Sequence, residues 1–112
     1  MYYVYILRCG DNSLYTGITH DIIKRVKIHY YKEQGTAKYT RSHQVTAVEA
    51  VWEVTDKSTA LRLEHFIKSL KKENKQDLIE NISLLNEIAK DKISDDYCLR
   101  LQYSLEEIIN EQ

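Results

Sequence analysis

Two tyrosines, an arginine, a histidine and a glutamate have the types and the spacing expected of a site that cleaves phosphodiesters. Tyr5 and Tyr15 are ten residues apart, and Arg25 follows ten residues after Tyr15. His29 lies one helical turn beyond Arg25, and Glu64 stands in a later apolar segment. Arginine offers a planar set of donors to phosphate oxygens, histidine can move a proton, and a carboxylate can hold a divalent ion. Together they indicate metal-assisted hydrolysis of a phosphate diester.

A hairpin followed by a helix is predicted to position the first four of these residues. Residues 2–8 and 14–18 are aromatic and β-branched runs that favour strands, and residues 10–13 (Gly-Asp-Asn-Ser) favour a tight turn between them. A turn centred near Asp11 would place Tyr5 opposite Gly17 and put Tyr5 and Tyr15 on one face of the sheet. Asp21 can cap a helix over residues 22–31, on which Arg25 and His29 share a direction.

The remainder of the chain predicts one more strand and a series of helices. Residues 35–44 read as a polar loop and residues 45–54 as the third strand. Helices are expected over 59–72, capped by Ser58, over 75–90, capped by Asn74, and over 97–110. The order predicts an α+β fold: a small three-stranded antiparallel sheet flanked by helices, with a ββαβα core and one or two extra C-terminal helices.

The distribution of charge divides the chain into two unequal parts. The 112 residues carry a net charge of −1, which by itself argues against a strongly basic nucleic-acid binder. Residues 1–80, however, hold 13 Lys and Arg against 10 Asp and Glu, whereas residues 81–112 hold 3 against 7. We therefore expect a functional module over 1–80 and an acidic helical extension over 81–112, packed on or appended to the same domain. Two cysteines without paired spacing and the lack of a long apolar run predict a cytoplasmic protein with no membrane contact.

A nucleic-acid backbone has several candidate contacts in the first half of the chain. Four consecutive basic and aromatic residues fall in the predicted loop: Lys38, Tyr39, Thr40 and Arg41. Such a segment can hold phosphates and stack on a base. Lys24 adds a cation to the helix that carries Arg25, and Gly17 would leave a gap beside Tyr5 through which a phosphate approaches the backbone.

Each of these residues also has an ordinary structural interpretation. Arg25 and His29 could belong to a solvated basic helix face, and Glu64 could form an i,i+4 ion pair with Lys68. Tyr5 and Tyr15 could be a packing pair, and residues 38–41 could be a solvated loop. Sequence alone leaves these alternatives open for each residue taken singly.

In combination, the motifs resemble the GIY-YIG endonuclease superfamily. Residues 3–5 (Tyr-Val-Tyr) and 15–17 (Tyr-Thr-Gly) resemble the two halves of the family motif, and Arg25, His29 and Glu64 follow in the family's order. Residues 14–19 and 38–41 look like the small single-domain bacterial branch, which is related to the nuclease subunit of structure-specific resolvases. The resemblance covers about residues 1–80, and Tyr3 departs from it by replacing the glycine of the first half.

The resemblance implies an endonuclease that uses one Mg²⁺ or Mn²⁺. Glu64 would hold the ion and Arg25 the scissile phosphate, while Tyr5, Tyr15 and His29 would orient or deprotonate the attacking water. The expected partner is DNA, with a homodimer or a protein partner as a further expectation for specific recognition. Two alternatives remain: a binding module that keeps this fold without cleaving, and a protein-interaction role for the acidic extension.

Overall fold

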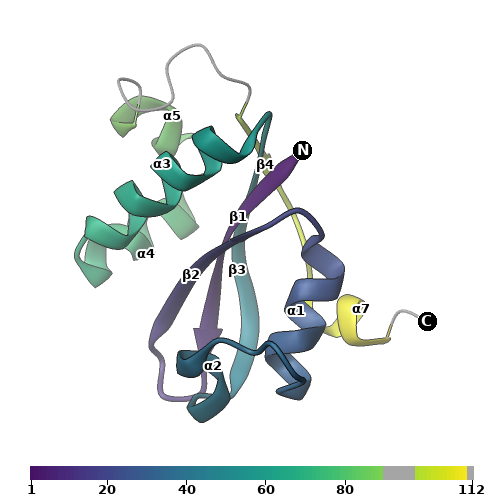
Figure 1. Cartoon of the computed structure of the whole chain (residues 1–112). Helices are drawn as coiled ribbons and strands as arrows, with labels where there is room; N and C mark the ends of the chain where they lie inside the picture. The colour runs from purple at the N-terminus through teal and green to yellow at the C-terminus, as the bar shows by residue number, and fades with distance from the viewer. Residues whose placement is uncertain (90–97, 111–112) are drawn as a thin grey trace.

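A four-stranded antiparallel sheet forms the centre of the part of the chain that the structure describes. The computed structural model describes residues 1–89 and 98–110. The strands are β1 (Tyr2–Cys9), β2 (Leu14–Thr19), β3 (Val45–Val54) and β4 (Cys98–Leu101), in the spatial order β2–β1–β3–β4 (Figure 1). The prediction of an α+β fold is confirmed, but the prediction of three strands is wrong because β4 adds a fourth.

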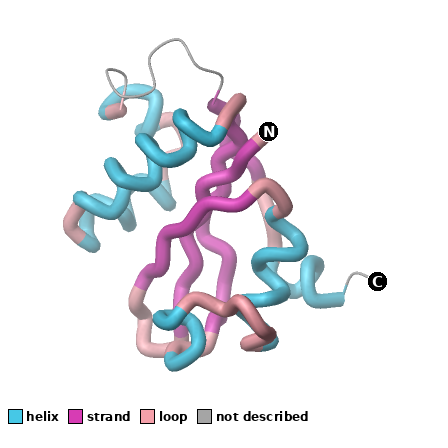
Figure 2. The backbone as a smooth tube through the Cα atoms, in the orientation of Figure 1, coloured by secondary structure: helices cyan, strands magenta, loops and turns pink. Residues whose placement is uncertain are grey.

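Helices cover both faces of this sheet (Figure 2). On one face, α3 (Lys57–Ser69), α4 (Lys72–Glu80) and α5 (Leu84–Ile88) pack against Val4, Ile6 and Trp52. On the other face, α1 (Ile22–Tyr31) and α7 (Leu105–Asn110) pack against Tyr5 and Leu7. Alternate residues of β1 therefore enter two separate cores, as the two-residue period of a central strand requires.

The hairpin register agrees with the prediction from the turn. Tyr5 pairs with Gly17, and Leu7 pairs with Tyr15. The turn is fixed by the Asp11 carboxylate, which accepts a hydrogen bond from the Ser13 backbone N–H at 3.1 Å. This register sets Tyr5 and Tyr15 on the same face, with their ring centroids 6.4 Å apart.

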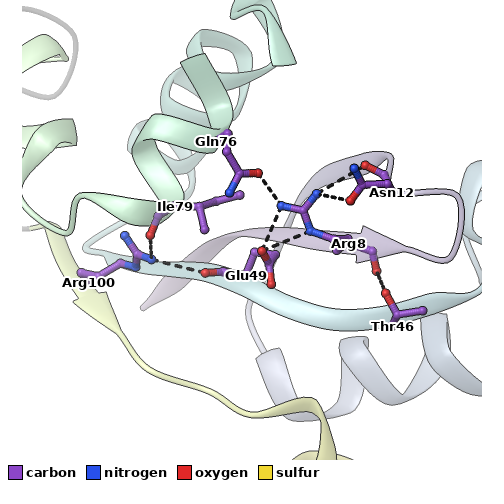
Figure 3. Close-up of polar contacts among 7 residues, drawn as sticks. All are labelled: Arg8, Asn12, Thr46, Glu49, Gln76, Ile79 and Arg100. Carbon is purple, nitrogen blue, oxygen red and sulfur yellow. Dashed lines mark hydrogen bonds and ion pairs between the residues drawn. The ribbon is translucent and has the colours of Figure 1, made fainter. Parts of the chain in front are cut away.

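The prediction of a last helix over residues 97–110 is wrong for residues 98–101 and confirmed for residues 105–110. Residues 98–101 form β4, which pairs with residues 51–54 of β3, and the helix itself spans only Leu105–Asn110. The Arg100 guanidinium of β4 donates to the backbone carbonyls of Glu49 and Ile79 (Figure 3). It donates to the Leu78 carbonyl at 3.1 Å as well. It also lies 5.1 Å from the centre of the Trp52 ring.

A second arginine, on β1, joins the sheet to α4. Arg8 of β1 forms an ion pair with Glu49 at 3.0 Å and also donates to Asn12 and Gln76 (Figure 3). Because Gln76 lies on α4, this cluster fixes α4 against the end of the sheet away from the chain's N-terminus. The Arg8 guanidinium is engaged in these structural contacts.

The helix boundaries differ from the sequence expectation where short polar turns intervene. The expected helix over 75–90 is divided into α4 and α5, because the Asn81 side chain accepts from the Ser83 N–H at 3.2 Å and closes a turn. Asp56, rather than Ser58, caps α3 by accepting from the Thr59 N–H at 2.8 Å. Residues 90–97 and 111–112, the rest of the expected acidic extension, lie outside the described residues.

The polar loop expected over residues 35–44 contains the short helix α2 (Lys38–Ser42). By contrast, α1 has the bounds that were predicted, and Asp21 caps it by accepting from the Lys24 N–H at 3.2 Å. In the described residues, no helix combines the length and the apolar character needed to cross a bilayer.

Ile108→Ala should lower the free energy of unfolding by ~3 kcal/mol, because the side chain is only 2% exposed and packs in the same core as Tyr5. Chemical denaturation followed by circular dichroism would measure the loss. Leu99→Ala is the control, since Leu99 is 44% exposed on the neighbouring strand and should change stability little. Equal stability of Ile108→Ala and wild type would mean that α7 contributes nothing to the core.

Candidate active site

Tyr5, His29 and Thr40 form a buried hydrogen-bonded chain across three elements. The Tyr5 hydroxyl lies 2.8 Å from His29 Nε2, and His29 Nδ1 lies 2.6 Å from Thr40 Oγ1. Tyr5 is 1% exposed, and both His29 and Thr40 are completely buried. The interpretation of His29 as part of a solvated helix face is therefore wrong: the residue points from α1 toward the sheet and meets the end of the Tyr5 side chain.

The electrostatic environment favours neutral forms of both Tyr5 and His29. Burial raises the pKa of the Tyr5 hydroxyl, and the neighbouring Tyr15 raises it further, while the nearby Arg25 acts in the opposite direction. Burial, with a smaller contribution from the Arg25 charge, lowers the pKa of His29 to about 4. At neutral pH the pair is thus a phenol beside an uncharged imidazole, which can accept a proton.

An aromatic column leads from this chain toward the surface. Tyr15 lies with its ring centroid 5.2 Å from that of His29, and Tyr39 stacks on Tyr15 at 5.9 Å. His43 in turn stacks on Tyr39 at 4.1 Å with an interplanar angle of 4°. Tyr39 thus stacks with two protein rings, and the column holds α2 against the hairpin. A contact of Tyr39 with a base stays a prediction.

Gly17 is buried at the point where the Tyr5 side chain ends. A Cβ atom on Gly17 would lie 2.5 Å from the Tyr5 oxygen and 2.7 Å from Tyr5 Cζ. The gap that the sequence predicted is present, but the phenol of Tyr5 fills it, and a phosphate would not reach the backbone there. Glycine at this position lets the Tyr5 hydroxyl reach His29.

Gly17→Ala should displace the Tyr5 hydroxyl from His29, because a contact of 2.5 Å cannot be kept. Overpacking of this kind costs about 1–3 kcal/mol. We expect a lower melting temperature and a loss of any Tyr5-dependent activity of at least about tenfold. Gly10→Ala is the matched control, since the nearest atom to a new Cβ there is 3.9 Å away. A Gly17→Ala protein with wild-type stability and activity would contradict this packing.

Arg25 and Glu64 bring opposite charges to the Tyr5 hydroxyl from two helices. The Arg25 guanidinium lies close enough to Tyr5 to lower the pKa of the phenol, and it donates to the Gly35 carbonyl at 3.0 Å. The Glu64 carboxylate on α3 is close enough to Tyr5 for its negative charge to raise the pKa of the phenol. The five residues named by the motif, Tyr5, Tyr15, Arg25, His29 and Glu64, are thus brought to one region of the fold.

Glu64 also makes the ion pair that its sequence context suggested. Its carboxylate is 3.2 Å from the Lys68 ammonium, one helical turn away, and its side chain is 18% exposed. In the described residues, no group of three or more His, Cys, Asp and Glu side chains is placed to hold a metal. A single, partly exposed carboxylate fits Mg²⁺ or Mn²⁺ nonetheless, because Mg²⁺ keeps most of its waters when one or two carboxylates bind it.

The expected nucleic-acid contacts divide into exposed and buried residues. Lys24, Lys38 and Arg41 are exposed on α1 and α2. Lys24 and Arg25 line the same shallow depression at the start of α1. Thr40 is completely buried, so its assignment to nucleic-acid contact is wrong. The turn of α2 places its hydroxyl against His29 instead, a role for which the sequence carries no distinguishing signal.

Comparisons with known proteins find a family model and several relatives that match this chain. A family model described as the GIY-YIG catalytic domain matches residues 1–77. A UPF0213 protein from Haloquadratum walsbyi is 47% identical over 88 residues, which span 77% of this chain and 94% of the relative. A UPF0213 protein from Fusobacterium nucleatum is 42% identical over 78 residues, or 70% of this chain and 76% of the relative. The solution NMR structure of a UPF0213 protein from Bacillus halodurans is 38% identical and covers 71% of this chain and 84% of that chain, with a TM-score of 0.45.

Proposed function

Because this chain belongs to the GIY-YIG family, we propose that it is a metal-dependent endonuclease that hydrolyses phosphodiester bonds in DNA. The observation that carries the proposal is the buried Tyr5–His29 hydrogen bond, flanked by the charges of Arg25 and Glu64. A neutral proton acceptor, a fixed cation and a carboxylate around one phenol are the groups that hydrolysis of a phosphate diester needs.

Each residue has a separate part in the proposed reaction. Arg25 binds the scissile phosphate and offsets the charge that develops on its oxygens. Tyr5 and Tyr15 orient the attacking water, and His29 receives a proton through Tyr5 as the new bond to phosphorus forms. One Mg²⁺ or Mn²⁺, held by Glu64, would supply charge stabilisation at the phosphate and at the leaving 3′-oxygen. The leaving oxygen takes its proton from solvent.

The surface around the site suits a nucleic-acid backbone more than a small phosphodiester. Lys24, Lys38 and Arg41 are exposed on α1 and α2, the helices that carry His29 and Tyr39, so they would bind neighbouring phosphates rather than the reacting one. The small positive excess of residues 1–80 predicts weak, salt-sensitive affinity. We therefore expect specific recognition to come from substrate shape, from a second copy of the chain or from a protein partner.

A cleavage panel tests the proposal. The full chain would be incubated with end-labelled single-stranded, duplex and branched DNA, and with RNA of the same sequences, in Mn²⁺, in Mg²⁺ and in EDTA. We expect cleavage of at least one DNA substrate with either ion and none in EDTA.

The Glu64–Lys68 ion pair favours a second candidate function, a nucleic-acid-binding module in which the lysine already neutralises the carboxylate. Tight binding without cleavage of any substrate would establish that alternative.

A further inference from the structure

His29 has a hydroxyl group at each of its two ring nitrogens. Nε2 faces the Tyr5 hydroxyl at 2.8 Å, and Nδ1 faces the Thr40 hydroxyl at 2.6 Å. A neutral imidazole has one N–H and one bare nitrogen, whereas a hydroxyl can both donate and accept. The two hydrogen bonds that join Tyr5, His29 and Thr40 can therefore both point toward Thr40 or both point toward Tyr5. Their direction decides which nitrogen of His29 carries the proton.

Counting hydrogens selects one of the two directions. Thr40 has a single hydroxyl hydrogen, and it donates this hydrogen to the Ala37 carbonyl at 3.3 Å. The Thr40 oxygen is then an acceptor for His29, which places the imidazole proton on Nδ1 and leaves Nε2 bare. Tyr5 donates to that bare nitrogen, and every hydrogen in the chain has an acceptor.

The opposite direction leaves a hydrogen without a partner. If His29 donated from Nε2 to Tyr5, the Tyr5 hydroxyl would need a different acceptor. In the described residues, His29 is the one hydrogen-bond partner of the Tyr5 hydroxyl, and the nearby Arg25 guanidinium has only donors. Tyr5 is 1% exposed and His29 is fully buried, so in the protein without substrate bulk solvent offers this hydrogen no ready acceptor. An unpaired buried hydroxyl is unfavourable, and the first direction is therefore preferred.

We propose that Thr40 is a positioning residue that holds His29 in the tautomer protonated on Nδ1. In this tautomer Nε2 accepts the proton of Tyr5, and the Tyr5 oxygen is left to accept a proton from the water that enters with the bound substrate. A water O–H bond breaks as a new Tyr5 O–H bond forms, and the original Tyr5 O–H bond breaks as the Nε2–H bond forms. The inference rests on the proposed nuclease function and adds to it the residue that sets the direction of proton transfer.

The tautomer can be measured in the wild-type protein without substrate or metal. Nitrogen-15 NMR of the full chain at neutral pH distinguishes a ring nitrogen that bears hydrogen from one that does not. We expect hydrogen on Nδ1 and a bare Nε2 for His29. Hydrogen on Nε2 would overturn the inference whatever the protein cleaves.

Two substitutions at Thr40 separate positioning from packing. Thr40→Ser keeps the hydroxyl and should keep both the tautomer and a cleavage rate near that of wild type. Thr40→Val keeps the shape but offers no acceptor, so His29 should move its hydrogen to Nε2 and cleavage should fall by about a hundredfold. A folded valine variant that retains hydrogen on Nδ1, or one that cleaves at the wild-type rate, would contradict the proposal. If the valine variant does not fold, the wild-type and serine spectra still decide the tautomer.

Different results would overturn the tautomer of His29 and the proposed nuclease function. Cleavage by a protein whose His29 carries hydrogen on Nε2 would remove the role of Thr40 and leave the nuclease intact. The expected tautomer in a protein that cleaves no substrate would instead overturn the nuclease function and, with it, any part for Thr40 in cleavage.

Discussion

Glu64→Gln should reduce the rate of Mn²⁺-dependent cleavage by more than about a hundredfold while the protein unfolds at its usual temperature. The amide has the size of the carboxylate but lacks the charge that would hold a divalent ion beside Tyr5. The one ion pair of Glu64 in the described residues is with Lys68 on the same helix, so its loss should cost the fold little. Single-turnover cleavage and thermal melting of the same preparations would measure the two effects.

Lys68→Ala is the control that separates a metal ligand from a surface ion pair. If Glu64 served only to pair with Lys68, the two substitutions would have the same small effect, of about 0.3–0.5 kcal/mol on stability, and neither would affect cleavage. We expect Lys68→Ala to cleave at or above the wild-type rate, since it leaves the carboxylate free. Equal activities of Glu64→Gln and wild type would refute the proposed role of Glu64.

Arg25→Ala should lower cleavage by a similar factor, because removing one donor to the developing charge commonly costs about 3–4 kcal/mol. Arg25→Lys should recover only part of the rate, since an ammonium keeps the charge but loses the planar pair of donors. The loss should appear mainly in the rate constant at saturating DNA, which single-turnover kinetics would report.

Lys24→Ala is the matched control for Arg25, because it removes the adjacent cation of α1 without touching Tyr5. Lys24 is exposed, and its loss should weaken DNA binding uniformly and reduce the salt dependence by about one counterion, with little change in the saturated rate. If the two alanine variants had the same effect on DNA binding and on the cleavage rate, Arg25 would only contact the DNA backbone. It would then have no part in stabilising the scissile phosphate.

The sequence was sufficient for the first half of the fold because local chemistry determines it. The turn at residues 10–13 and the aromatic strands set the hairpin register, and the Asp21 cap sets the start of α1. The register puts Tyr5 and Tyr15 on one face of the sheet, and α1 sets Arg25 and His29 one turn apart. These four residues of the candidate site could therefore be placed from the sequence. These relations depend on neighbours within a few residues along the chain.

The parts that could not be anticipated depend on contacts between distant segments. β4 is a strand because residues 98–101 pair with β3 and because Arg100 reaches backbone carbonyls more than twenty residues away. Thr40 is buried because stacking of Tyr39 between Tyr15 and His43 holds α2 against the hairpin. No periodicity within residues 35–44 signals the burial of Thr40, since a five-residue helix is too short to show a pattern.

The dependence of cleavage on Mn²⁺ concentration tests the central claim most directly: that one carboxylate, one cation and a phenol–imidazole pair form a site for a single divalent ion. For the wild-type chain on its preferred DNA, we predict a rate that rises in first order with Mn²⁺, reaches a plateau and returns to zero when EDTA is added. Cleavage that persists in EDTA, or a complete absence of cleavage at every Mn²⁺ concentration and on every substrate, would contradict that prediction.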